Sequence, residues 1–288
     1  PFLFEERKRE ESQKNNNSTR ASLIFIGGFN FSKTDKLIFS LLQNKLRYDT
    51  PGEENFDDRD EILSIMRIRY SKLLTPFFEA FVGTEGTYSH IVYLFSEKSS
   101  NNNINRVLKL SSGGNYLGKN VSSANTFDVS ANYTVYDFED LNPNFKSFSF
   151  RQFTATDSST IRIFKDFSFN VYGYLKLSEQ GDFKWNSFSE RPTRFLEEIY
   201  GEPKFTFTLN KINLSFGLRY FSLKTFNYDK RDKILDSDYL SKGPLMEIFF
   251  LVKDILFLRI YGWYEFITIN KTIKQEQTNL IMQVSWNF

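Results

Sequence analysis

The chain has 288 residues, of which 40% are hydrophobic and 18% aromatic, including 33 Phe and 15 Tyr. Its 37 basic and 35 acidic residues leave a net charge of +2, which indicates no nucleic-acid partner, and the absence of Cys excludes disulfides and thiolate chemistry. Mean hydropathy is −0.42, and no segment reaches the roughly 18–20 uninterrupted apolar residues of a membrane helix.

Apolar and polar residues alternate with a period of two along most of the chain, and this pattern predicts 13 strands. In chain order they cover residues 20–32, 36–48, 61–74, 77–91, 105–119, 125–138, 147–164, 167–178, 194–209, 212–227, 242–252, 255–270 and 277–288. Residues 2–9 could supply a further strand. Because barrels made of one bacterial chain have even strand numbers, we expect about 14 strands, with 12 or 16 as alternatives.

Very short turns alternate with longer polar stretches between the expected strands. Apolar residues flank the turns Lys165-Asp166, Asn210-Lys211 and Lys253-Asp254, as two-residue hairpins require. The longer polar stretches are 179–193, 228–241 and 271–276. Tight turns at one end and long loops at the other are typical of a transmembrane meander barrel.

The chain ends on LIMQVSWNF, a strand with one apolar face and one largely polar face. The apolar face consists of Leu280, Met282, Val284, Trp286 and Phe288. This segment resembles the C-terminal strand of bacterial outer-membrane β-barrels, whose alternating apolar residues and terminal Phe are recognised by the insertion machinery. The resemblance implies an outer-membrane location, with membrane lipid, the barrel-assembly machinery and other envelope proteins as partners. The high use of Asn, Lys, Phe and Tyr is similar to that of envelope proteins of the Bacteroidota, although no motif identifies a specific family.

The polar strand faces are expected to line the lumen, because a charged side chain facing lipid at the midplane costs about 2–4 kcal/mol. Alternation assigns one set of charged residues to that lining: Arg67, Arg69, Glu79, Glu85, Lys109, Asp128, Arg151, Lys176, Arg219, Glu247, Arg259 and Glu265. The opposite face is expected to place against lipid Phe169, Leu214, Phe216, Leu258, Trp286 and Phe288.

Two interpretations of the lumen remain open. Cross-strand ion pairs could simply fill an enclosed polar wall, or the charges could set the selectivity of a wet channel. The inward aromatic residues either fill space or form a stacking surface for solutes: Tyr172, Tyr174, Tyr261 and Trp263.

We expect no catalytic, metal or cofactor site. His90 is the single His of the chain, and its neighbour Ser89 lies on the opposite strand face, so the two cannot act as base and nucleophile. The acidic stretch 53–61 lacks the glycine and ligand spacing of a calcium loop and predicts a solvated loop.

Residues 1–288 therefore predict a single domain, an all-β transmembrane antiparallel meander β-barrel whose first and last strands pair. Because the chain opens on Pro1, we expect a signal peptide or N-terminal segment upstream of it. The expected function is non-enzymatic, a porin-like channel for small polar solutes. The alternative is a structural or scaffold barrel that anchors a larger cell-surface or secretion complex.

Overall fold

One antiparallel sheet of 13 strands makes up most of the computed structural model. The structure describes residues 17–49, 56–141, 144–183, 192–229, 232–252 and 256–286. The strands are β1 (Asn17–Asn30), β2 (Asp35–Asp49), β3 (Arg59–Thr75), β4 (Phe78–Tyr93), β5 (Asn103–Leu117), β6 (Val121–Tyr136), β7 (Phe148–Phe164), β8 (Phe167–Asp182), β9 (Arg194–Leu209), β10 (Ile212–Asp229), β11 (Asp232–Val252), β12 (Leu256–Ile269) and β13 (Ile273–Trp286). A single turn of 3-10 helix, η2 (Ser99–Asn101), lies between β4 and β5. Within these ranges, no helix is long and apolar enough to cross a membrane.

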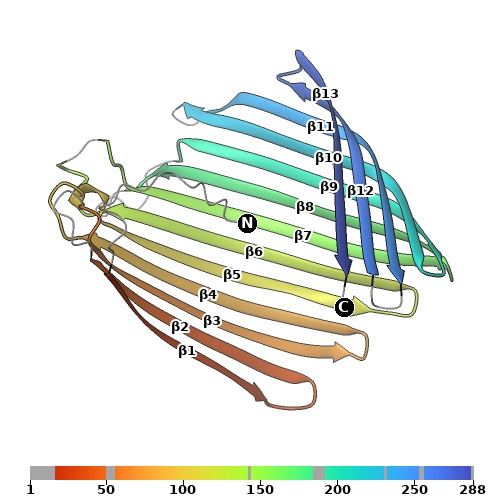
Figure 1. The fold of residues 1–288 in the computed structure, drawn as a ribbon, viewed down its shortest axis with the longest axis horizontal. Coiled ribbons are helices and arrows are strands. Elements are labelled where there is room, and N and C mark those ends of the chain that lie inside the picture. The colour runs from red at the N-terminus through yellow and green to blue at the C-terminus, as the bar shows by residue number, and fades with distance from the viewer. Residues whose placement is uncertain are drawn as a thin grey trace.

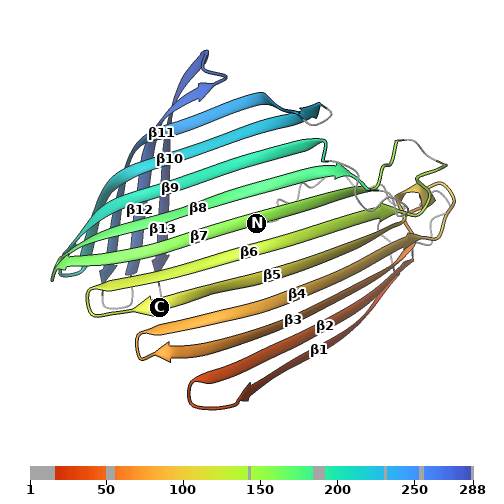
Figure 2. The ribbon, with the colours of Figure 1, turned by 180° about the vertical axis from the view of Figure 1, so that it is seen from behind.

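Each strand pairs with its neighbours in chain order, so the sheet is a meander, as Figure 1 shows. Figures 1 and 2 show the sheet curling across its width, so that β12 and β13 run steeply across the direction of β5–β8. The expected all-β antiparallel meander is confirmed. The candidate strand at 2–9 lies outside the described residues. Within the described residues β1 pairs only with β2 and β13 only with β12, so the expected pairing of first and last strands is not among these contacts.

The tight turns gather at one end of the sheet. The predicted turns Lys165-Asp166 and Asn210-Lys211 are confirmed, and Asn210 adopts a left-handed φ of 54° that suits a tight hairpin. The predicted turn Lys253-Asp254 lies outside the described residues. Strand β13 runs toward this same end (Figure 1).

Asp35 holds the turn between β1 and β2 together. Its carboxylate accepts hydrogen bonds from the Ser32 and Tyr70 hydroxyls, both at 2.5 Å. The Thr34 hydroxyl donates to it at 3.0 Å, and the Lys72 Nζ lies 3.3 Å away. These donors, led by the Ser32 hydroxyl, lower the pKa of Asp35 well below its usual range.

At the opposite end, several strands extend further than the alternation predicted. The predicted loop 228–241 is wrong, because β10 continues to Asp229 and β11 begins at Asp232. The predicted loop 271–276 is also wrong, because β13 begins at Ile273. Outside the hydrocarbon both faces of a strand can be polar, so apolar alternation stops before the strand pairing does.

Cross-strand pairing sorts the side chains into two faces, since directly opposed residues share a face. One row of paired residues is Arg67, Glu85, Lys109, Ser130, Gln152 and Ser178. We call the face that carries this row the polar face. The next row along the strands lies on the other side, here called the apolar face, and includes Leu110, Val129, Phe153 and Leu177.

The two faces differ in how closely their side chains pack. Leu245, Ile267 and Glu265 are buried on the polar face, whereas Phe216 and Leu218 are exposed on the apolar face. Side chains crowd on the concave side of a curved sheet and spread on its convex side. The burial pattern therefore indicates that the sheet curves toward its polar face.

Two prolines lie opposite Leu218, one on each neighbouring strand. Pro244 of β11 pairs with Leu218, and the register of β9 with β10 places Pro203 opposite the same residue. Pairing between β9 and β10 is recorded at Gly217 and resumes at Tyr220. Because proline has no N–H, neither Pro203 nor Pro244 donates a backbone hydrogen bond to a neighbouring strand.

Close backbone approach explains one glycine of β11. A Cβ added to Gly243 would collide with the carbonyl oxygen of Tyr264 on β12, which is a rigid backbone atom. A Cβ added to Gly86 or Gly201 would meet no atom within 4 Å. Gly243 is therefore required by β11–β12 packing, whereas the other two glycines are not required by space.

Candidate functional site

A connected group of charged and aromatic side chains lies on the polar face of β8–β12. We call it the charged–aromatic cluster, and it comprises Tyr174, Lys176, Glu198, Tyr200, Glu202, Lys204, Arg219, Glu247, Arg259, Tyr261, Trp263 and Glu265. Alternate residues of one strand point to one side of a sheet, and the cross-strand register brings these positions side by side.

Lys204 and Glu247 form the centre of the cluster. The Lys204 Nζ lies 2.8 Å from Glu247 Oε2 and 3.6 Å from Glu202 Oε1. The Arg259 Nε donates to Glu247 Oε1 at 2.6 Å. Two cations thus share one carboxylate, and one of them also reaches a second carboxylate, which links β9, β11 and β12.

Tyrosine hydroxyls satisfy the remaining carboxylate oxygens. Glu202 Oε2 accepts hydrogen bonds from the hydroxyls of Tyr200 at 2.5 Å and Tyr261 at 2.9 Å. The Tyr174 hydroxyl donates to Glu198 Oε1 at 2.6 Å. The rings of Tyr174 and Tyr200 stack with centroids 5.3 Å apart and an interplanar angle of 17°. These contacts hold the carboxylates in fixed orientations.

Arg219 lies close to two aromatic rings. Its guanidinium carbon is 5.4 Å from the Tyr200 ring centroid and 4.6 Å from that of Trp263. Its Nε lies 3.6 Å from Glu265 Oε1, which is too long for a hydrogen bond, and Asn279 donates to the other Glu265 oxygen at 3.4 Å. Within the part of the chain that the structure describes, the buried Arg219 Nε and Trp263 Nε1 have no hydrogen-bond partner.

A second set of charges occupies the polar face of β3–β6. Arg67 donates a hydrogen bond to Glu85, and the Lys109 Nζ lies 3.0 Å from Asp128 Oδ2. Glu85 and Lys109 are directly paired across β4 and β5. The predicted residue Arg69 lies on the same face, so opposite charges alternate across these four strands.

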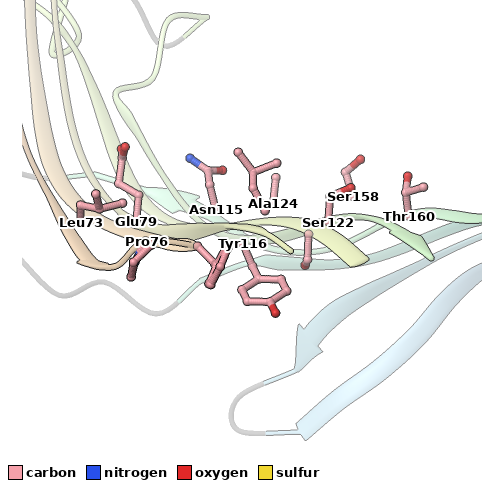
Figure 3. A pocket seen from close by; sticks show the side chains of 12 residues that line it. Leu73, Pro76, Glu79, Asn115, Tyr116, Ser122, Ala124, Ser158 and Thr160 are labelled. Carbon is pink, nitrogen blue, oxygen red and sulfur yellow. The ribbon is translucent and has the colours of Figure 1, made fainter. Parts of the chain in front are cut away.

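A depression of about 420 Å³ lies beside the tight turns of β3–β7. Figure 3 shows the side chains of Glu79, Asn115, Ser158 and Thr160 on one side of the sheet and that of Tyr116 on the other. Its polar lining consists of a carboxylate, an amide and hydroxyls. No group of three or more His, Cys, Asp or Glu side chains that could hold a metal ion occurs among the described residues.

The structure places the predicted lumen-lining residues on the polar face, with the exception of Arg151. That residue pairs with Ala131 on β6 and Glu179 on β8, which belong to the apolar face. Its assignment to the same face as Asp128 and Lys176 is therefore wrong. The run SFSF before Arg151 offers no charged residue that would distinguish one parity from the other, and Arg151 lies close to the long-loop end, where water is available to a charge on either face.

Sequence reasoning missed the contribution of β9 to the cluster. Glu198, Tyr200, Glu202 and Lys204 occupy alternate positions of this strand, and they alternate with residues that include Ile199. The period-two alternation along this strand could have identified these four residues as members of the polar face. The adjacent acidic pair at 197–198 and the proline at 203 obscure that parity in the sequence.

The apolar face continues into the last strand. Leu280, Met282, Val284 and Trp286 are exposed and pair with Gly262, Ile260, Leu258 and Leu256 of β12. Phe288 lies outside the described residues. A wide face of exposed Leu, Ile, Val and Phe side chains on a folded sheet indicates contact with lipid.

No protein-family model matches the chain, and no curated protein matches it in sequence. Solved structures match it in fold. A mutant of the ferric enterobactin receptor PfeA from Pseudomonas aeruginosa aligns with a TM-score of 0.56 at 10% identity, over 90% of this chain and 52% of the receptor. A second mutant of that receptor aligns with a TM-score of 0.55 at 11% identity, over the same shares of the two chains.

The chain thus spans about half the length of the receptor chains that it matches. At such low identity the likeness shows the fold alone. The two-faced antiparallel meander, with its tight turns at one end, thus has the fold of an outer-membrane β-barrel.

Proposed function

We propose that the chain forms the wall of an outer-membrane conduit for small polar solutes, with its polar face toward the lumen. The observation that supports this most directly is the unbroken polar row from Arg67 to Ser178, together with the charged–aromatic cluster that the same face carries on β8–β12. A face of this kind would be costly against hydrocarbon, because one midplane charge costs about 2–4 kcal/mol. Against a water-filled lumen it carries no such cost.

The ion pairs support a hydrated wall better than a dry core. The Arg259 side chain is 43% exposed and that of Lys109 38%, although both make ion pairs. Charges with this exposure still meet water, as the lining of a conduit does. Acidic and basic residues occur in similar number along the wall and pair with one another. We therefore expect ion selectivity to arise only locally, where one sign of charge is exposed.

Planar-bilayer recording of the purified full-length protein tests the proposal. We expect stable conductance steps, and we expect Arg259→Glu to change the ion selectivity because this side chain is exposed on the polar face. Lys165→Glu makes the same charge change in a tight turn and serves as the matched control. A silent barrel that co-purifies with stoichiometric partners would instead establish the scaffold function.

A further inference from the structure

The cations of the charged–aromatic cluster are more exposed than the carboxylates that they neutralise. Arg259 is 43% exposed and its partner Glu247 12%. Arg219 is 25% exposed and its partner Glu265 12%. Formal charges in the cluster balance, yet the surface that a solute meets is basic.

Hydrogen bonding explains why the carboxylates are covered. Glu247 accepts from both Lys204 and Arg259, so its two oxygens lie beneath the two cations. Glu202 is covered by two tyrosine hydroxyls and by Lys204. An approaching anion would meet N–H and O–H donors before it met a carboxylate.

The environment of Arg219 adds an independent observation. Its guanidinium carbon lies 5.4 Å from the Tyr200 ring centroid and 4.6 Å from that of Trp263, and among the described residues its Nε has no hydrogen-bond partner. The nearest carboxylate, that of Glu265, lies 3.6 Å from Nε, which leaves the pair without a hydrogen bond. A positioned guanidinium with unused donors is suited to an anionic ligand.

We infer that the charged–aromatic cluster is a binding station for small anions. This inference rests on the proposed conduit and names the class of solute that the wall favours. Arg259 supplies the exposed donors, Arg219 adds a second, partly buried guanidinium beside Trp263, and Glu247 holds Arg259 and Lys204 in place. The station concentrates anions near Trp263, which provides an optical signal at the site.

Ion quenching of Trp263 fluorescence tests the inference without any requirement for conduction. Trp185→Phe and Trp286→Phe leave Trp263 as the only tryptophan of residues 1–288. In detergent, iodide should quench its fluorescence with a constant about tenfold above that of caesium, the lower end of the enrichment that focused fields produce. Arg259→Gln should bring the two constants to within about twofold of each other.

Lys165→Gln removes a cation outside the cluster and should leave the iodide preference unchanged. Glu247→Gln provides a second variant, because it removes a covered carboxylate and should strengthen the preference for iodide. Equal quenching by iodide and caesium in the parent protein would overturn the inference, as would an iodide preference that persists in Arg259→Gln.

Bilayer recordings separate this inference from the proposed function. Conductance without iodide preference would leave the conduit standing and remove the anion station. Iodide preference without conductance would show that the site binds anions but would contradict the proposed conduit. The site would then have no role in permeation.

Discussion

Replacing Val129 by Arg shows which face of the sheet meets lipid. Val129 lies in the middle of β6, is 54% exposed, and pairs with Leu110 and Phe153 on the apolar face. Hydrocarbon contact at this position would raise the free energy of the inserted barrel by about 2–4 kcal/mol when a guanidinium is introduced. The neighbouring substitution Ser130→Arg is the matched control, because Ser130 lies on the polar face opposite Lys109.

Equilibrium unfolding of the two variants in lipid vesicles measures the difference. The cost at Val129 corresponds to a folded-to-unfolded ratio lower by about 30-fold to about 700-fold. At Ser130 the new guanidinium can remain hydrated, so we expect a loss below about 1 kcal/mol. Equal losses in the two variants, or a larger loss at Ser130, would refute the assignment of the faces.

Three further outcomes are expected. Gly243→Ala should lower the free energy of unfolding by about 1–3 kcal/mol through its collision with Tyr264, whereas Gly86→Ala, with open space around it, should be tolerated; thermal unfolding of both variants checks this. Because the folded-state pKa of Asp35 is lowered, its contribution should be fully present above the ordinary carboxyl pKa of about 4 and be lost as pH falls through the folded value. Limited proteolysis of the β1–β2 turn across that pH range measures this contribution of Asp35 to the stability of the turn. The variant Asp35→Asn is the pH-insensitive comparison. Deleting β13 (Ile273–Trp286) should abolish the heat-modifiable, membrane-inserted form, because β12 would lose a backbone partner. An unchanged amount of that form on gels would contradict this.

Alternation sufficed to predict the architecture because each strand that contacts lipid needs one apolar face. It assigned Arg219 and Asp128 to one face and Leu214 and Phe216 to the other, as the cross-strand register has them. It could not predict where strands end outside the hydrocarbon. At Asp229 both faces are polar, and only backbone pairing with β11 continues the strand.

The composition of the cluster required information that one strand does not contain. The ion pair of Lys204 with Glu247 joins β9 to β11 across the intervening β10, and it depends on side-chain reach as well as on register. Parity indicates which face each residue occupies, but not how residues on different strands are offset along the barrel wall. The exposure of Arg259 relative to Glu247 likewise follows from three-dimensional packing alone.

The prolines beside Leu218 weaken the backbone pairing of the sheet next to the cluster. Pro203 directly follows Glu202, and Pro244 directly follows Gly243, so backbone pairing is thinnest where the charged network crosses from β9 to β11. Separating strands at this level breaks fewer interstrand hydrogen bonds than elsewhere in the sheet. Amide protons near Arg219 should therefore exchange with solvent through local openings that the rest of β10 does not share. Such local openings would let the sheet change its width beside the cluster while the flanking strands keep their register.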